Sequence, residues 1–537
     1  MLLARASVVL LFVGAGCTRP EQAAVTPDSS TDVPDAPDDP PACTGTSLEC
    51  ATIWEQAASA RFDALLTDPA ELATFLKQVP KGGDLHNHLT GAVYAETYLD
   101  WAGEDGNCIN SSSFSVVGSG SCSSTNVAVP TTGAFFDSTV RAWSMEGFVA
   151  GGETGRDHFF ATFGKFGLVA GAHRNESIAD LAKRAADENE LYVETMFNMA
   201  KNVGELSASL FSGTLTASGL PTLYDQLINN AGFANAVTND VNVVNNAAAG
   251  YRNVLGCDDL GASEACDVGV RFIAQVSRTG SSDQVFGQLV GAFEMAARTN
   301  QIVGVNLSSP EDASSSIANY NLHMAMLDFL HAQYAGKSPL HITLHAGELT
   351  PEYLPPNSTA NTFHIRAAVQ TGHAERIGHG LDVMSELDPA ALMAEMANKR
   401  VLVEVCLSSN VQILEVSGSA HPLAEYLAQG VPVALATDDQ GVSRSSMAGE
   451  YLLAALDQHL TYRQLKTLAR NSLEHAFLPG PSLWSTGAVP VEACATTDTM
   501  GIGDAPNASC ATFLETSERA QMQWKLEGNF LAFESQQ

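Results

Sequence analysis

Short apolar runs that alternate with longer helical stretches are the feature of this sequence that most restricts its fold. Several of these runs are nearly continuous Val, Ile and Leu, which is typical of parallel strands covered by helices on both faces. Eight such runs occur, at residues 83–90, 190–197, 269–277, 302–309, 339–346, 375–382, 401–409 and 432–439. Eight strands that alternate with helices predict an α/β protein with the (β/α)8 architecture of a TIM barrel.

The connections between these runs have uneven lengths. Residues 91–189 separate the first run from the second, and residues 198–268 separate the second from the third. We expect both long connections to be insertions at the barrel mouth. The sequence therefore predicts a barrel domain at residues 51–480 and a C-terminal extension at residues 481–537.

The N-terminus, "MLLARASVVLLFVGAGC", has one Arg, a short apolar run and small residues before Cys17. The run is too short to span a bilayer stably, so residues 1–17 predict an export signal. The position of Cys17 resembles a bacterial lipoprotein cleavage site. Residues 18–50 begin with a Pro- and Asp-rich stretch and predict a disordered tether. We expect an exported protein, either a cell-envelope lipoprotein or a secreted one.

The number and the spacing of the cysteines are consistent with export. With Cys17 lipidated and Cys406 inside an apolar run, eight of the ten cysteines remain. They lie in four close pairs: Cys43/Cys50, Cys108/Cys122, Cys257/Cys266 and Cys494/Cys510. Eight cysteines allow 105 pairings, so four local disulfides are a hypothesis drawn from proximity. An oxidising compartment fits this pattern best.

The net charge restricts the partners. The chain has 27 Lys and Arg against 60 Asp and Glu, a formal charge of -33. Such an acidic surface repels phosphate backbones, which argues against nucleic-acid polymers as partners. It also limits membrane contact to a lipid on Cys17. We expect a small-molecule partner, and a homodimer stays open.

Potential metal ligands stand at the ends of three predicted strands. His86 and His88 in "DLHNH" are two residues apart, so both imidazoles face the same side of a strand. His345 lies at the end of the fifth run, one residue before Ala346, and Asp438 lies at the end of the eighth, one residue before Asp439. In a TIM barrel the active site lies at the C-terminal ends of the strands. Three imidazoles and one carboxylate, with one position left for water, suit a catalytic zinc ion.

The motifs "DLHNH", "HAGE", "IGHG" and "TDDQG" occur in the order found in the adenosine deaminase family. The chain resembles that family over most of residues 51–480, and most closely its secreted branch, the adenosine-deaminase-related growth factors. The resemblance implies one Zn2+ per chain, held by the four ligands above. It also implies hydrolysis of adenosine, and of 2′-deoxyadenosine, to inosine and ammonia by a zinc-activated water.

The same resemblance assigns roles to three further residues. Glu348 would protonate the purine nitrogen N1, so we expect burial to raise its pKa. His379, in "IGHG", would orient the attacking water or receive its proton. Asp439 would meet both the attacking hydroxide and the purine nitrogen N7.

Two positions depart from the family pattern at the expected substrate pocket. Thr90 stands where deaminases commonly have an Asp that contacts the ribose. Ser309 stands where the family has a glycine whose backbone N–H contacts the purine. The preferred nucleoside therefore stays open. The segment "LSSN", at residues 407–410, is expected to end the seventh strand and to support the metal site.

Two other functions stay open. One is a metal-dependent amidohydrolase that acts on adenine, a modified adenine nucleoside or a cyclic amide. Binuclear amidohydrolases typically have a bridging lysine on the fourth strand, and the run 302–309 has none. The other is a non-catalytic surface binding protein on a deaminase scaffold. Glu348, His379 and Asp439 are all present, which weighs against a purely binding role.

Overall fold

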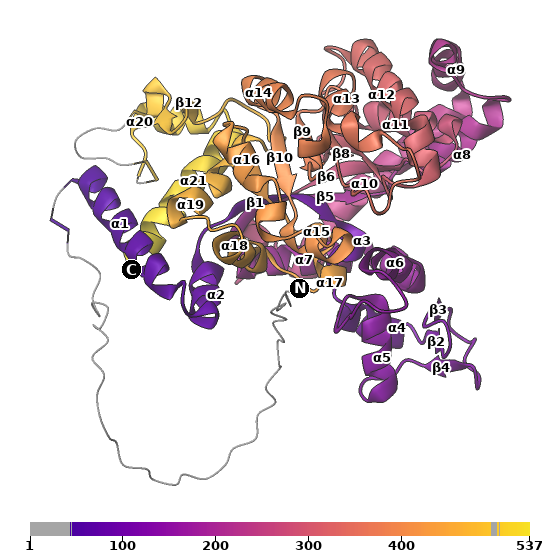
Figure 1. Ribbon diagram of the computed structural model, residues 1–537, viewed down its shortest axis with the longest axis horizontal. Coiled ribbons are helices and arrows are strands. Elements are labelled where there is room, and N and C mark those ends of the chain that lie inside the picture. Colours follow the sequence, from indigo (N-terminus) through magenta and orange to yellow (C-terminus); the bar gives the residue numbers. More distant parts are fainter. Residues whose placement is uncertain (1–42, 45, 496–501, 504) are drawn as a thin grey trace, which may run out of the picture. The chain divides into compact units, whose positions relative to one another are not determined.

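Eight parallel strands form the barrel, with helices around them (Figure 1). The structure is a computed structural model that describes residues 43–44, 46–495, 502–503 and 505–537. The predicted export signal and most of the predicted tether lie outside these residues. The barrel strands are β1 Gly82–His88, β5 Glu190–Phe197, β6 Gly269–Ser277, β7 Ile302–Ser308, β8 His341–Ala346, β9 Arg376–His379, β10 Leu402–Val405 and β11 Val433–Leu435.

The barrel closes between its last strand and its first. The strands follow the order β1-β5-β6-β7-β8-β9-β10-β11, and each is parallel to its neighbour. Just beyond β11, the backbone N–H of Asp438 donates to His86 O at 2.9 Å, and the N–H of His88 donates to Asp438 O at 3.0 Å. These bonds complete the ring, so the predicted (β/α)8 barrel is confirmed.

Five strands end earlier than their apolar runs predict, and the largest differences are at β9, β10 and β11. Strand β9 ends at His379, whose φ of 66° lies in the left-handed region. A strand continues only with negative φ, so this residue stops it. Strand β10 ends at Val405, because Leu407–Leu414 form a helix, α15. The prediction that "LSSN" ends a strand is therefore wrong, since these residues begin a helix.

Helices lie after each barrel strand. The helices of this layer are α7 Arg174–Asp187, α8 Lys201–Leu210, α9 Leu220–Ile228, α10 Ala231–Leu255, α11 Ser282–Ala296, α12 Ser314–Tyr334, α13 His364–Gln370, α14 Pro389–Lys399, α15, α16 Leu423–Ala428, α17 Gln440–Ser443, α18 Met447–Leu456 and α19 Tyr462–Glu474. Helices α8 and α10, from the second long connection, pack against α11 and α7. This part of the connection therefore extends the outer helical layer and does not cover the barrel mouth.

The first long connection forms a small subdomain with its own core. It contains α3 Leu89–Ala92, α4 Ala95–Glu104, a three-stranded antiparallel sheet of β2 Cys108–Asn110, β3 Val116–Val117 and β4 Asn126–Ala128, then α5 Ala134–Trp143 and α6 Gly155–Ala172. The ring of Tyr98 stacks on Phe166, and the buried Trp143 donates its indole N–H to Phe114 O at 2.7 Å.

Helices from the two ends of the described chain pack together. Helix α1, Ser47–Leu65, and helix α2, Pro69–Gln78, lie with α19 and with α21, Glu518–Glu534. Helix α1 begins before the boundary predicted at residue 51, because Thr46 and Glu49 form a capping box. The remaining C-terminal elements are β12 Trp484–Thr486, β13 Val489–Pro490 and α20 Ala508–Leu514.

All four predicted cysteine pairs are disulfide-bonded, and Cys406 is a buried free thiol. Of the helices in the described part of the chain, none has the length and apolar character that a membrane span requires.

The aromatic cluster between the terminal helices should contribute strongly to stability. The ring of Phe533 packs edge-on against Phe75 at 5.3 Å and beside Tyr462 at 6.4 Å, and its side chain is buried. We expect Phe533→Ala to lower the free energy of unfolding by about 3 kcal/mol, because it leaves a cavity. Urea denaturation followed by circular dichroism measures this. Leu168→Ala, at a position that is 54% exposed, is the control and should cost less than about 1 kcal/mol. Equal losses in the two variants would contradict the packing role.

Candidate metal centre

The four predicted ligands converge on one point at the C-terminal ends of the strands. His345 Nε2 lies 3.1 Å from His86 Nε2 and 3.2 Å from His88 Nε2. Asp438 Oδ1 lies 3.6 Å from His86 Nε2 and 3.4 Å from His88 Nε2. Four atoms at about 2 Å from one zinc ion lie about 3.3 Å apart in a tetrahedral arrangement. The spacing of the four side chains therefore fits a single ion.

The opposite side of each imidazole is also fixed. Each Nδ1 faces a side-chain oxygen: His86 faces Glu404 Oε2 at 2.7 Å, His88 faces Gln275 Oε1 at 3.2 Å and His345 faces Asn306 Oδ1 at 2.6 Å. These oxygens accept hydrogen bonds, so each Nδ1 carries the proton. The lone pair of each Nε2 then points at the common centre, as in metal-binding histidines. The fourth ligand is oriented by Ser409, whose hydroxyl donates to Asp438 Oδ2 at 2.7 Å.

Glu404 links the metal site to a buried ionic network. Arg376 donates from Nε to Glu404 Oε1 at 2.6 Å and from a terminal nitrogen to Glu194 Oε2 at 2.6 Å. All three side chains are fully buried. Burial alone would raise the pKa of Glu404, but Arg376 and the hydrogen bond from His86 outweigh it and hold this pKa below its usual value. Glu404 is therefore ionised beneath His86.

His379 also lies at this centre. Its hydrogen bonds give it a different tautomer from the three histidine ligands. One atom of His379 lies within 4.8 Å of ligand atoms from His86, His345 and Asp438. The backbone N–H of Leu423 donates to His421 Nδ1 at 3.1 Å, so His421 donates from Nε2 to Asn410 Oδ1 at 3.2 Å.

The amide group of Asn410 then faces the other way and donates to His379 Nδ1 at 3.2 Å. Burial lowers the pKa of His379 to about 3, so the ring is neutral and its single proton sits on Nε2. A protonated Nε2 donates a hydrogen bond and does not ligate a metal. We therefore retain His88, and not His379, as the third histidine ligand beside His86, His345 and Asp438.

Glu348 and Asp439 are buried acids beside the metal site. Glu348 Oε1 lies 3.8 Å from His379 Nε2, and its side chain is 9% exposed. Burial, together with the negative charge of Asp438, raises the pKa of Glu348 well above its usual value. Burial and the same neighbour also raise the pKa of Asp439. The pKa of Glu348 is thus raised in the structure, as expected from the sequence.

Glu311, which the sequence analysis did not assign, holds the backbone at Glu348. Its carboxylate accepts the backbone N–H groups of Gly347 at 3.2 Å and Glu348 at 2.9 Å, and it accepts from His364 Nδ1 at 2.7 Å. Ser309, the predicted substrate contact two residues earlier, has a φ of 80°. This position keeps a backbone conformation that favours glycine.

Gln275, Asn306 and Glu404 were also missed, although the sequence carries a signal for them. Each is an isolated polar residue within a largely apolar strand run. A polar side chain inside a closed barrel requires a buried partner, and here that partner is a histidine of the metal site.

The fold and the site together define a (β/α)8 barrel with a buried cluster of three histidines and one aspartate that could hold a metal ion. Residues 245–483 match the family model for adenosine deaminase. The adenosine deaminase of Serratia proteamaculans (strain 568) is 34% identical over 224 residues, which cover 42% of this chain and 58% of that protein. That of Escherichia coli O1:K1 / APEC is 32% identical over 227 residues, which cover 41% and 62%.

The family model and both relatives support the adenosine deaminase family for the part of the chain that they match. The chain spans about three fifths of the length of these curated relatives, 58% and 62%. Among solved structures, adenine deaminase from Arthrobacter aurescens is 19% identical, with 74% of this chain and 94% of that chain covered and a TM-score of 0.46. The N6-mAMP deaminase of Arabidopsis is 22% identical, with 75% and 95% covered and a TM-score of 0.46.

Glu404 should set the affinity for the metal through His86. We expect Glu404→Gln to weaken zinc binding by about 10- to 100-fold, because the neutral amide no longer fixes the tautomer of His86. Competition with a chromophoric chelator measures the dissociation constant. Glu415→Gln, at an exposed carboxylate, is the matched control and should bind zinc like the wild type. An unchanged constant in Glu404→Gln would show that this contact does not support the ligand.

Gly91 should be required to leave room for Asp439. A Cβ atom at Gly91 would lie 1.7 Å from Asp439 Oδ1, so alanine forces the carboxylate to move. We expect Gly91→Ala to lower kcat/KM for the substrate by about 100-fold or more, since small displacements at a reacting group are costly. Zinc content should stay the same. Gly103→Ala is the control, because its Cβ would meet only Val129, at 3.8 Å. Similar activity in both variants would argue against a role for the position of Asp439.

Proposed function

We propose that this protein is a zinc-dependent deaminase that hydrolyses adenosine, and 2′-deoxyadenosine, to inosine and ammonia. The observation that carries this proposal is the placement of a buried acid, Glu348, beside a four-ligand metal site and a neutral His379. A metal alone would suit many reactions. A carboxyl group with a raised pKa next to it suits protonation of a ring nitrogen.

The donor set fits zinc, since three imidazoles and one carboxylate are ligands that this ion prefers. His86, His88, His345 and Asp438 would hold it. A bound zinc ion lowers the pKa of water from 15.7 toward about 7, which makes hydroxide available at neutral pH.

The residues of the chain would act on the purine and the attacking water. Glu348, kept protonated by burial, would donate its proton to N1 and make C6 more electrophilic. His379 would donate its Nε2–H to the attacking oxygen and so orient it. The tautomer supports this orienting role over the alternative, in which His379 takes up the proton. Asp439 would donate to N7, because its raised pKa keeps it protonated more readily than an ordinary Asp.

The substrate could differ from adenosine, because the edge of the pocket departs from the family pattern at Ser309. The Ser309 hydroxyl bonds with the Ser277 hydroxyl at 2.9 Å, where the family has a glycine without a side chain. This difference favours testing adenine and modified adenine nucleosides beside adenosine. We also propose export of the protein, which the four disulfides support.

One assay tests the proposal. The mature protein is purified, its metal content is measured, and ammonia release is followed with adenosine, 2′-deoxyadenosine, adenine and 5′-modified adenosine. We expect turnover of adenosine, its loss after treatment with a chelator and its return with zinc. Ammonia from adenine alone would favour the alternative function, a metal-dependent amidohydrolase that acts on adenine. No ammonia from any of these compounds, with zinc bound, would favour a binding protein.

Glu348 should determine the alkaline limit of activity. We expect Glu348→Gln to lower kcat/KM by more than about 100-fold, because the amide has no proton to give to N1. The reactive form of Glu348 is the protonated one, so wild-type activity should fall as the pH rises through its raised pKa. A profile of kcat/KM against pH measures this, and the alkaline limb assigned to Glu348 should be missing in the variant.

Glu352→Gln is the matched control, because Glu352 is an exposed carboxylate in the same loop. It should keep both the activity and the pH profile of the wild type. A loss of less than about 100-fold in Glu348→Gln would argue against an essential proton donor.

A further inference from the structure

The first insertion reaches the mouth of the barrel through the start of helix α6. This helix packs on α3, α15 and α17, which directly follow β1, β10 and β11 (Figure 1). The approach to α15 is close, because a Cβ atom at Gly155 would lie 2.0 Å from Gln412 O. The first residues of α6 therefore lie at the C-terminal ends of the strands, where the candidate metal centre also lies.

Arg156, the second residue of α6, binds the loop that follows β7. Its Nε donates to Asp312 Oδ2 at 2.5 Å, and a terminal nitrogen donates to Asp312 Oδ1 at 2.6 Å. The side chain of Asp312 is 8% exposed and that of Arg156 is 20% exposed, so water screens this pair less than it screens a surface pair. Two parallel bonds to one carboxylate also fix the orientation of both groups.

Two aromatic rings lie beside the guanidinium group of Arg156. Its central carbon is 5.3 Å from the centre of the Phe160 ring and 5.7 Å from the centre of the Tyr353 ring. Phe160 belongs to α6, whereas Tyr353 lies in the loop after β8, the loop that contains Glu348. Contacts of this kind favour a planar guanidinium group over an ammonium group. Arg156 therefore contacts the loops that follow two neighbouring strands.

Glu311, which precedes Asp312, carries the contact from this loop into the site. Its buried carboxylate accepts the backbone N–H groups of Gly347 at 3.2 Å and Glu348 at 2.9 Å. Of two adjacent carboxylates, one thus binds the first insertion and the other binds the backbone of the proposed acid. A displacement of Asp312 would move Glu311 with it.

The backbone at Glu348 depends on this support because it lies beyond the end of its strand. Strand β8 ends at Ala346, and Gly347 has a φ of 80°, which no strand residue adopts. The carboxylate of Glu311 takes the place of a strand partner for the next two N–H groups. The position of the acid therefore follows the position of the loop after β7.

We propose that Arg156 of the first insertion is a positioning residue for the acid Glu348. By binding Asp312, it fixes the loop from which Glu311 holds the backbone of that acid. This inference rests on the function proposed above and gives the first insertion a role in the reaction. Small displacements of a reacting group are costly, so the contact should matter for turnover although Arg156 acts only through other residues.

Hydrogen–deuterium exchange with mass spectrometry tests the link without an activity assay. Peptides that contain the N–H groups of Gly347 and Glu348 are compared in the zinc-loaded full chain and its variants. We expect Arg156→Gln to speed exchange in these peptides by about tenfold, because the loop that holds them opens more readily. Glu311→Gln loses the direct acceptor and should speed exchange at least as much.

Arg470 provides the matched control for Arg156. It donates to Glu527 through two parallel bonds, at 2.7 and 2.6 Å, and the two side chains are 28% and 8% exposed. It also lies 5.9 Å from the centre of the Trp484 ring. This ion pair joins α19 to α21, away from the loop after β7. Arg470→Gln should therefore leave exchange in the two peptides unchanged.

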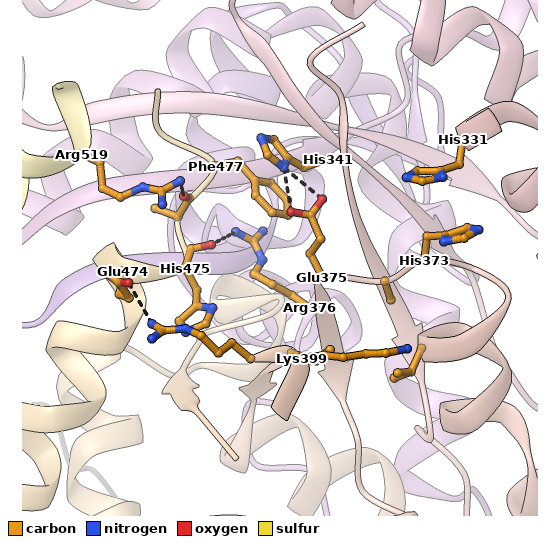
Figure 2. Close-up of a pocket in the computed structure, with 15 residues that line it drawn as sticks. His331, His341, His373, Glu375, Arg376, Lys399, Glu474, His475, Phe477 and Arg519 are labelled. Carbon is orange, nitrogen blue, oxygen red and sulfur yellow. Dashed lines mark hydrogen bonds and ion pairs between the residues drawn. The ribbon is translucent and has the colours of Figure 1, made fainter. Parts of the chain in front are cut away.

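Glu375 provides the matched control for Glu311. Both carboxylates accept from a histidine Nδ1 and from backbone N–H groups near the same strand. Glu375 accepts from His341 Nδ1 at 2.9 Å and from the N–H of Ile342 at 3.4 Å, at the start of β8 and not at its end (Figure 2). Glu375→Gln should therefore leave exchange after the end of β8 unchanged.

Steady-state kinetics separate a positioning role from a purely structural one. We expect Arg156→Gln to lower kcat by about tenfold or more, with KM within about threefold of the wild-type value and the zinc content unchanged. Arg156→Lys keeps the charge but cannot bind both oxygens, so it should recover part of the lost kcat. Asp312→Asn should match Arg156→Gln, and the double variant should be no slower than either, because the two residues act as one unit.

Three results would overturn the proposal. The first is unchanged exchange at Gly347 and Glu348 in Arg156→Gln. The second is an equal loss of kcat in Arg156→Gln and Arg470→Gln. The third is a loss confined to KM, which would place Arg156 in substrate binding. A wild-type protein without deaminase activity would contradict the proposed function, and the exchange measurement would still decide the link. If circular dichroism shows that Arg156→Gln does not fold, Arg156→Lys decides.

Discussion

The hydrogen bonds between β1 and the residue after β11 are the constraint on which the metal site depends. Asp438 exchanges both its backbone groups with His86 and His88, so the residues that close the barrel are also candidate metal ligands. Asp438 has a φ of 57°, which is unfavourable for an aspartate outside special settings. Its backbone bonds to β1 and the contact from Ser409 hold it there. Closure of the ring and assembly of the site are therefore one structural event.

The buried carboxylates around the site fall into two groups according to their partners. Glu404 and Glu311 each meet cationic or hydrogen-bonding groups, and these outweigh burial and lower the pKa of both side chains. Glu348 and Asp439 have mainly other carboxylates as neighbours, so burial and repulsion raise their pKa. The first group orients ligands and backbone. The second group keeps its protons to a higher pH than ordinary carboxyl groups do, which is why it carries the proposed proton donation.

The barrel, and the convergence of the candidate ligands at its rim, could be predicted from the sequence because both depend on local patterns. Continuous apolar runs mark buried parallel strands, and the ligand motifs stand at the ends of those runs. Strand ends were predicted less well, since a positive φ at His379 or Asp438 results from contacts with other strands. The partners of the histidines were missed for a similar reason. Glu404 meets His86 only after the ring closes, 318 residues apart in sequence.

The tautomer of His379 could not be predicted from its motif either, because it depends on a chain of contacts that begins at the backbone of Leu423. "IGHG" identifies a histidine at a strand end, as "DLHNH" and "HAGE" do, and pattern alone gives all of them the same donor atoms. The environment of Nδ1 distinguishes them: an oxygen acceptor leaves a lone pair on Nε2, whereas the amide donor of Asn410 leaves a proton there.

The two ends of the barrel strands carry different charged groups, and Arg376 contacts both sets. At the C-terminal ends, three imidazoles and one carboxylate converge on the candidate metal centre. At the N-terminal ends, guanidinium and ammonium groups gather around a cavity. Arg376 lines that cavity, yet its Nε binds the carboxylate that orients His86. Glu404 and Glu194 together fix its position. The buried ion pairs of Arg376 thus connect the carboxylate behind His86 with the opposite end of the barrel.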